Sequence, residues 1–241
     1  MILVLGGTGE ARELAGGLHA AGTRVMTSLA GRVGRPRLPA GEVRVGGFGG
    51  PVALARWIAE HDVRAVVDAT HPFARRISAS AARACLLASV PLLRLERPGW
   101  SERPGDRWLW VEDLSEAAVA TAGHRVLLTT GRQGLAAFAD ADDAWFHVRC
   151  VDPPEPPLPR HNELLLDRGP YTLQGELALV DAHRIDLVVT KDSGGPLTAA
   201  KLDAARERGL AVVVVRRPPS GAGVETVTTV DAALAWALAQ R

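Results

Sequence analysis

Three short stretches of the sequence hold residues that could do chemistry, and the first is GGTGEAR, residues 6–12. It follows the apolar run MILVL, so it lies where a first strand would turn into a first helix. Glycines in such a turn let the backbone approach a pyrophosphate, whose charge is favoured by the free N–H groups at the start of the helix. Any tight connection between a strand and a helix also favours glycine, so a purely structural turn is the alternative. The place of this turn, after the first strand, favours a bound dinucleotide.

The end of the expected second strand bears on which dinucleotide binds. Sites for NAD usually place Asp or Glu about 20 residues after the glycines, where it holds the ribose 2′-hydroxyl. Residues 27–32 read TSLAGR and contain no carboxylate. Ser28, Arg32 and Arg35 instead suit a 2′-phosphate, which predicts NADPH as the cofactor rather than NADH. The alternative is a solvated loop with ordinary arginines.

The second stretch, VDATHPFA, ends a long apolar strand, and GGFGG at residues 46–50 ends the strand before it. Both should border the cofactor cleft, with Gly47 against the cofactor. Asp68, Thr70 and His71 would then bring hydrogen-bonding groups near the nicotinamide. A histidine before a proline can also cap the helix that follows, and the sequence leaves both roles open for His71.

The third stretch, TKDSGGPLTAAK at residues 190–201, holds both lysines of the chain. It begins at the end of an apolar strand, where a compact ammonium could bind a carboxylate of a ligand. Lys191 could instead form a salt bridge with Asp192, but we prefer the role in ligand binding. For Lys201 we expect an ordinary solvated position on a helix.

Short β-branched runs alternate with amphipathic stretches along the whole chain, which is the pattern of βαβ units with parallel strands. GWSERPGDR at residues 99–107 has the composition of a linker. We therefore predict an α/β fold of two Rossmann-like domains, with mainly parallel sheets that face a shared cleft. Residues 1–98 would bind NADPH and residues 108–241 would contribute substrate contacts. The second domain should have a helix after HRVLLTTG, and a helix from about Asp231 to Ala239 should close it.

Composition excludes several classes of protein. The chain has 241 residues, a formal net charge of +1 and no apolar run long enough to span a membrane. No basic patch favours nucleic acid, and no leader peptide is recognisable, so we expect a cytoplasmic protein. The histidines show no metal-binding spacing, and we expect no metal. Cys85 and Cys150 are interpreted as reduced core thiols. A short-chain dehydrogenase is excluded because the only tyrosine, Tyr171, has no lysine four residues later.

The series of motifs GGTGEAR, VGGFGG, DATHPFA, RLERP, TTGR, DRGPY, TKDSGG and VVVVRRP resembles the precorrin-6A reductase family of cobalamin biosynthesis. The motifs occur in order over nearly the whole chain. The resemblance implies NADPH-dependent reduction of one double bond of a tetrapyrrole, giving precorrin-6B. It implies three sets of residues: Gly6, Gly7, Thr8, Gly9 and Glu10 against NADPH; Asp68, Thr70 and His71 at the reaction site; and Arg132, Arg168, Tyr171, Lys191, Asp192 and Ser193 from the second domain.

Two alternatives to this function stay open. One is a dinucleotide-binding sensor without catalysis, and the other is an NADPH reductase of a different polycarboxylate. The resemblance also makes enzymes of the same pathway conceivable partners. It identifies no proton donor and does not say whether the macrocycle carries cobalt.

Overall fold

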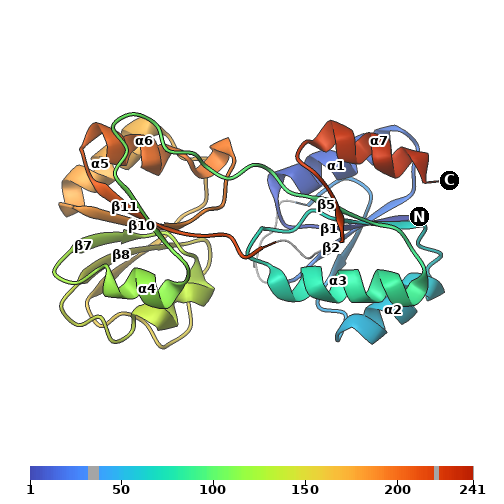
Figure 1. Cartoon of the computed structure of the whole chain (residues 1–241), viewed down its shortest axis with the longest axis horizontal. Helices are drawn as coiled ribbons and strands as arrows, with labels where there is room; N and C mark the ends of the chain where they lie inside the picture. Colours follow the sequence, from blue (N-terminus) through green and yellow to red (C-terminus); the bar gives the residue numbers. More distant parts are fainter. Residues whose placement is uncertain (32–37, 220–222, 241) are drawn as a thin grey trace. The chain divides into compact units, whose positions relative to one another are not determined.

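The computed structural model describes residues 1–31, 38–219 and 223–240, and the chain forms two compact units. Unit 1 comprises Met1–Pro98 together with Pro218–Arg241, and unit 2 comprises Gly99–Arg217. The sequence-based division differs from this, because residues 218–241 were expected in the second domain. The expected linker also belongs to the body of unit 2. Each unit is a sheet between layers of helices (Figure 1).

Unit 1 contains a sheet of six strands in the order β12-β5-β4-β1-β2-β3, and all its pairings are parallel. This is the strand order of dinucleotide-binding sheets, with the order reversing between β1 and β4. The strands are β1 (Ile2–Leu5), β2 (Val25–Leu29), β3 (Glu42–Val45), β4 (Ala65–Asp68), β5 (Leu92–Leu95) and β12 (Glu225–Val227).

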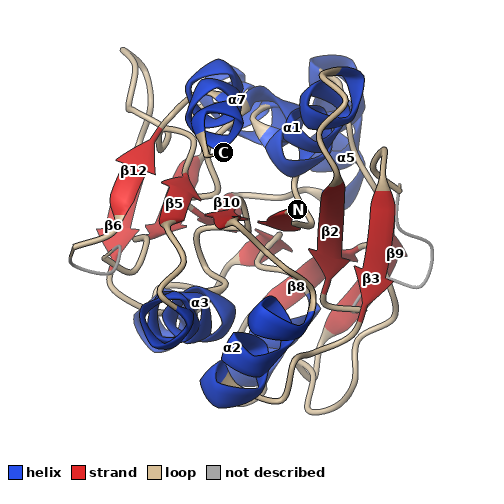
Figure 2. Ribbon diagram, turned by 90° about the vertical axis from the view of Figure 1, so that its right-hand side faces the viewer, coloured by secondary structure: helices blue, strands red, loops and turns tan. Residues whose placement is uncertain are grey.

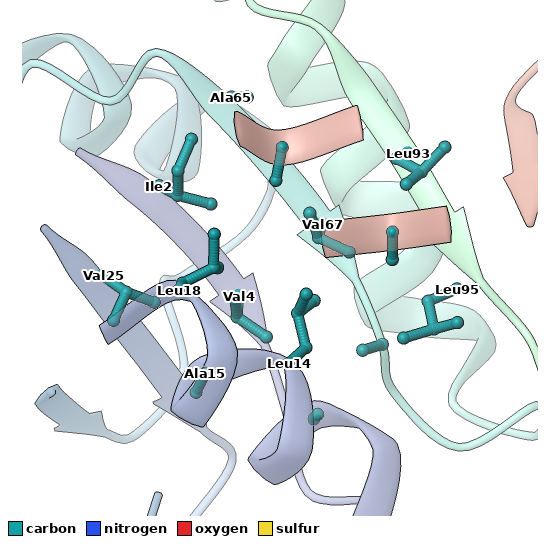
Figure 3. Packing of buried hydrophobic residues seen from close by; sticks show 14 residues of the cluster. Ile2, Val4, Leu14, Ala15, Leu18, Val25, Ala65, Val67, Leu93 and Leu95 are labelled. Atoms are coloured by element: carbon teal, nitrogen blue, oxygen red, sulfur yellow. The ribbon is translucent and has the colours of Figure 1, made fainter. Parts of the chain in front are cut away.

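Helices cover both faces of this sheet (Figure 2). α1 (Gly9–Ala20) and α7 (Val230–Ala239) lie on one face, and α2 (Pro51–Glu60) and α3 (Arg75–Ala88) on the other. β1 and β4 are buried on both sides, which explains why their sequences are continuous apolar runs rather than alternating ones. Ile2, Val4 and Val67 pack against the inner face of α1 (Figure 3). The core therefore fixes the carboxyl ends of β1 and β4 side by side.

Unit 2 repeats this sheet with the order β6-β11-β10-β7-β8-β9, again with parallel pairings only. α5 (Leu173–His183) packs beside α6 (Ala200–Glu207), and α4 (Leu114–Val119) beside the 3-10 helix η1 (Arg132–Phe138). A second 3-10 helix, η2 (Pro196–Thr198), precedes α6. The strands are β6 (Trp108–Val111), β7 (Arg125–Leu128), β8 (Trp145–Cys150), β9 (Asn162–Leu166), β10 (Leu187–Lys191) and β11 (Ala211–Val215).

The structure bears on two of the sequence-based expectations. The α/β fold with two parallel sheets is confirmed. Cys85 and Cys150 are free and buried, as expected of core thiols. Among the described residues, none of the helices combines the length and the apolar character that a membrane span requires.

Candidate functional site

The glycine-rich turn after β1 has the geometry of a ligand-facing loop. A Cβ on Gly6 would lie 2.7 Å from Thr27 Cγ2, so only glycine fits against β2 there. Gly7 has a φ of +120°, which favours glycine, and no atom lies within 4 Å of where its Cβ would be. The turn is therefore held tightly on its inner side and is open on its outer side. Gly9 begins α1 directly after it.

Thr8 joins this turn to the loop after β4. Its hydroxyl accepts a hydrogen bond from the Ala11 N–H at 3.1 Å, which makes it the N-cap of α1. The same hydroxyl donates to the Ala69 carbonyl at 2.8 Å. The two loops on either side of the point where the strand order reverses are thus connected, and this is the point where α/β sheets bind ligands.

A small pocket lies at this edge, between the turn after β1, the loop after β4 and the end of β5. Glu10, in the first turn of α1, is paired there with Arg97, whose Nη1 lies 2.7 Å from Glu10 Oε2. The ion pair neutralises the only acid of that first turn. The lining residues are Thr8, Glu10, Ala69, Thr70, Pro72, Leu95, Glu96 and Arg97.

Asp68, at the end of β4, lies within a buried network of hydrogen bonds and ion pairs. Its Oδ2 is 2.6 Å from Arg94 Nη1, and both side chains are less than a tenth exposed. Its Oδ1 accepts from the Thr70 hydroxyl at 2.7 Å and from the Thr70 N–H at 3.1 Å. Arg94 also donates to Glu96 and to Ser78. Asp68 therefore holds the Thr70 hydroxyl in place, and Thr70 and Glu96 are the members of this network that line the pocket.

His71 organises the turn before α3. Its Nδ1 accepts the Phe73 N–H at 3.2 Å, and its carbonyl accepts the Ala74 N–H at 2.8 Å. The ring is partly exposed. When the ring is neutral, its proton must lie on Nε2, because Nδ1 is the acceptor. α3 begins at Arg75, later than the proline where the sequence predicted it.

Ser28, the predicted ribose contact, is a buried residue near the end of β2 and is paired in register with Arg44 of β3. Arg44 Nη1 lies 3.4 Å from the Ser28 hydroxyl, and the guanidinium also donates to the carbonyls of Gly46 and Gly47. Its Cζ lies 3.8 Å from the centre of the Phe48 ring. Sequence reasoning missed Arg44, because only the register between β2 and β3 places it beside Ser28. Arg32 lies outside the described residues.

In unit 2, Lys191 ends β10 and Asp192 follows it. The carboxylate of Asp192 accepts the Trp100 N–H at 2.9 Å and pairs with Arg217 at 3.0 Å. Asp192 is thus held by its own unit. Lys191 is partly exposed, and burial lowers the pKa of its ammonium. The Ser193 N–H donates a hydrogen bond to the Lys191 carbonyl, which forms a tight turn at this strand end.

The sequence-based expectation of a solvated Lys201 was wrong, because this residue is only 4% exposed. It lies on the inner face of α6, donates to the Thr198 carbonyl, and places Nζ 4.6 Å from the centre of the Trp100 ring. Trp100 comes from the expected linker, so the residue that covers Lys201 was assigned to no domain. Burial, with a smaller contribution from nearby Arg149, lowers the pKa of Lys201 to about 7.

Arg149 and Glu176 form a second buried ion pair, in which Nη1 lies 2.7 Å from Oε1. The guanidinium of Arg149 lies over the ring of Tyr171, with Cζ 3.8 Å from its centre. The Tyr171 hydroxyl donates to the Asp167 carbonyl at 3.2 Å, and burial raises the pKa of this hydroxyl. Sequence reasoning missed Arg149, since an arginine inside a strand gives no signal of its partner on a helix.

The remaining predicted substrate residues follow other strands of the same sheet. Arg132 begins η1 after β7, and its Nη1 lies 3.4 Å from the Pro153 carbonyl. Arg168 follows β9, and its N–H donates to the Asp167 carboxylate at 2.7 Å. The carboxyl ends of β7, β9 and β10 lie at one edge of a parallel sheet, so unit 2 brings this set of cations to the same edge.

The chain matches the family described as precorrin-6x reductase CbiJ/CobK over residues 1–238. It is 52% identical to the precorrin-6A reductase of Rhodococcus erythropolis over 238 residues, which cover 98% of this chain and 96% of the relative. It is 32% identical to the cobalt-precorrin-6A reductase of Priestia megaterium over 233 residues, 90% of this chain and 91% of the relative.

A solved structure described as CobK precorrin-6A reductase has the same fold. It superposes with a TM-score of 0.93 at 40% identity, and the match covers 99% of this chain and 96% of the other. The likeness therefore includes both units and the strand ends at which the sites above are built.

Proposed function

Because the chain belongs to the precorrin-6x reductase family, we propose that it reduces one double bond of precorrin-6A with NADPH and gives precorrin-6B. The observation that carries this proposal within the structure is the turn after β1, open on its outer side and tied by Thr8 to the loop after β4. Relatives 52% and 41% identical are named precorrin-6A reductases, whereas one at 32% is named for the cobalt form. We therefore propose the cobalt-free macrocycle as the substrate.

The residues of unit 1 fit a bound NADPH. Gly7 leaves space where a side chain would block a pyrophosphate, and the N-terminus of α1 presents N–H groups there. Ser28 and Arg44 stand at the end of β2, where such folds hold the adenosine ribose, and the Arg44 guanidinium suits a 2′-phosphate. Bound there, NADPH would supply the hydride that reduces the macrocycle.

Three residues of unit 1 would shape the reaction site in different ways. Thr70 lines the pocket and is the candidate to contact the reacting groups. Asp68 is a positioning residue, because both its oxygens are engaged by Thr70 and Arg94. His71 can offer a proton only from Nε2 in its neutral form, since Nδ1 accepts the Phe73 N–H. Asp68 and Thr70 would thus orient the reacting groups, and His71 Nε2 would be the proton source.

Unit 2 would hold the carboxylates of the macrocycle. Lys191 and Arg132 follow neighbouring strands of one sheet and carry positive charge at its carboxyl edge. Arg168 is partly exposed in the loop after β9 and adds a third cation. Arginine forks and a lysine point charge together suit several carboxylates on one flat ring. Asp192 and Ser193 would act by shaping the turn that presents Lys191.

The test is to mix the purified protein with NADPH and precorrin-6A without oxygen and to follow both the macrocycle spectrum and NADPH oxidation. We expect one NADPH to be consumed for each macrocycle reduced. Binding of NADPH with no change in the macrocycle would support a sensor instead. Turnover of cobalt-precorrin-6A in preference to the cobalt-free form would overturn the choice of substrate but not the reductase.

A further inference from the structure

A cluster of three ligating side chains lies in unit 2, away from the substrate edge of its sheet. His147 of β8 is paired in register with Glu163 of β9, and His183 is the last residue of α5. Their ligand atoms all lie within 4.8 Å of one another. The chain enters β10 at Leu187, soon after α5 ends, so the cluster lies near the amino ends of the strands. The predicted substrate residues follow the carboxyl ends.

His147 has an unusual environment for a buried polar side chain. The residue is only 2% exposed, and neither ring nitrogen has a hydrogen-bond partner among the described residues. Buried polar groups almost always have a partner, and one left without it costs about 1–3 kcal/mol. The ring instead lies against that of His183, with centroids 4.0 Å apart, and His183 Nδ1 is 3.4 Å from Glu163 Oε2.

We propose that His147, Glu163 and His183 bind one divalent transition-metal ion of the zinc class. Two imidazoles and a carboxylate are a ligand set typical of Zn²⁺, with solvent completing the fourth position, whereas Ca²⁺ and Mg²⁺ prefer oxygen ligands. Ligand atoms on a tetrahedral ion with bonds of about 2.0–2.1 Å lie about 3.3 Å apart. The cluster must therefore contract, and the side chains of His183 and Glu163, 28% and 54% exposed, have room to rotate inward.

Surrounding contacts position one ligand and suggest what the ion does. Arg125 Nε donates to the His183 carbonyl at 2.9 Å, and its guanidinium lies over the ring of Trp145, which stacks with His183. β9 is an edge strand whose residues are mostly exposed, so little apolar burial holds it. An ion shared by β8, β9 and α5 would fasten this edge strand to the body of unit 2.

The experiment is calorimetric titration of Zn²⁺ into the full chain, purified without a histidine tag and freed of metal with a chelator. We expect one Zn²⁺ per chain at micromolar affinity or tighter, and a rise in Tm when Zn²⁺ is added. His183→Gln and Glu163→Gln alter the two less buried members, and each should weaken binding at least about tenfold. Co²⁺ in place of Zn²⁺ should give the absorption of a tetrahedral site.

His124→Gln is the matched control, because His124 is a half-exposed histidine of the same unit, 3.0 Å from Asp186. It should bind Zn²⁺ as the unaltered chain does. The proposal is overturned if the folded chain binds no stoichiometric Zn²⁺ or if His183→Gln and Glu163→Gln both keep full Zn²⁺ affinity. It is also overturned if His124→Gln weakens Zn²⁺ binding as much as those two variants do. None of these readouts depends on reductase activity, so failure here is distinct from failure of the proposed function.

Discussion

The turn after the central strand differs between the two units, although β1 and β7 hold the same place in their sheets. After β1, an α-helix of 12 residues begins within the turn and Thr8 caps it. After β7, a 3-10 helix of 7 residues follows and no side chain caps it. Gly7 and Gly131 both have positive φ with no atom near a would-be Cβ, so the glycines alone do not distinguish the turns. The capped helix does, because its aligned N–H groups favour an anion.

The comparison also concerns the sixth strand of each sheet. β6 follows β5 in the chain but pairs with β11 in unit 2, and β12 follows β11 but pairs with β5 in unit 1. Each half of the chain thus gives its sixth strand, and the helix after it, to the other unit. Two chain crossings therefore connect the units, and neither half of the chain could complete either unit alone.

The largest effect should come from the buried charge network at the strand ends of unit 1. Asp68→Asn leaves Arg94 buried without its main partner, and loss of one member of such a pair typically costs about 3–5 kcal/mol. We expect the free energy of unfolding in urea to fall by that order. Turnover should fall with it, because the single amide oxygen of Asn can replace only one of the two carboxylate oxygens that bind Arg94 and Thr70.

Glu176→Gln is the counterpart in unit 2, where it breaks the buried pair with Arg149. It should lower stability by a similar amount without changing NADPH affinity. If Glu176→Gln weakened NADPH binding, the assignment of the cofactor to unit 1 would fail.

The next effect tests the two turns directly. Gly7→Val places a side chain where the pyrophosphate would lie, and we expect NADPH affinity to fall by about 100-fold, or about 2.7 kcal/mol. Gly131→Val carries a similar backbone strain of about 1–3 kcal/mol in the turn of unit 2. It should leave the dissociation constant for NADPH unchanged. Equal losses in both variants would contradict the difference between the turns.

Much of the fold was predictable because the apolar runs of parallel strands and the alternation of strands and helices are local signals. The membership of β12 and α7 in unit 1 was not, since a boundary is inferred from continuity along the chain, and the return of the chain to unit 1 at Pro218 breaks that continuity. The helix expected after β7 is a 3-10 helix in the structure. A Cβ at Gly134 would lie 2.9 Å from Leu114 Cδ1, so packing against α4 is close there.

The candidate site was predictable to a similar degree. The glycine turn and the DATH segment follow strands, and their position at a sheet edge could be inferred from the order of residues alone. Partners from distant segments could not be inferred. Arg44 faces Ser28 only through strand pairing, and Trp100 covers Lys201 only because the expected linker packs against α6.

Lys201 provides a smaller, pH-dependent test of unit 2. Its pKa is about 7 in the folded chain, against about 10.4 when unfolded, so between these values the unfolded state binds more protons. Stability must then rise with pH above about 7, by up to about 1.4 kcal/mol per pH unit. Urea unfolding at pH 7.5 and 8.5 should show this rise, and Lys201→Met should reduce it.

Cys85, whose pKa burial raises to about 12, acts with the opposite sign as cysteine ionises in the unfolded chain near pH 8.5. The difference in slope between the unaltered chain and Lys201→Met therefore isolates the contribution of Lys201. Lys191→Met serves as the comparison, since burial lowers the pKa of Lys191 too and its contribution has the same sign. A slope unchanged in Lys201→Met would mean that this ammonium does not lose its proton in the folded chain.

The smallest effect concerns the choice between NADPH and NADH at the end of β2. Arg44 lies beside Ser28 in unit 1 and can form a charge-assisted contact with a 2′-phosphate. Arg44→Met keeps most of the aliphatic stem and removes the guanidinium, which lies over the Phe48 ring. NADPH affinity should therefore fall by about tenfold, or about 1.4 kcal/mol, with NADH affinity nearly unchanged. Dissociation constants for both cofactors measure the preference.

Arg216→Met is a matched control, because Arg216 also lies near an aromatic ring, that of Trp110, but belongs to unit 2. It should leave both constants as they are. An Arg44→Met protein that still prefers NADPH would assign the 2′-phosphate to another residue, and a loss of NADH affinity equal to that of NADPH would mean that Arg44 supports the fold of the site rather than the choice of cofactor.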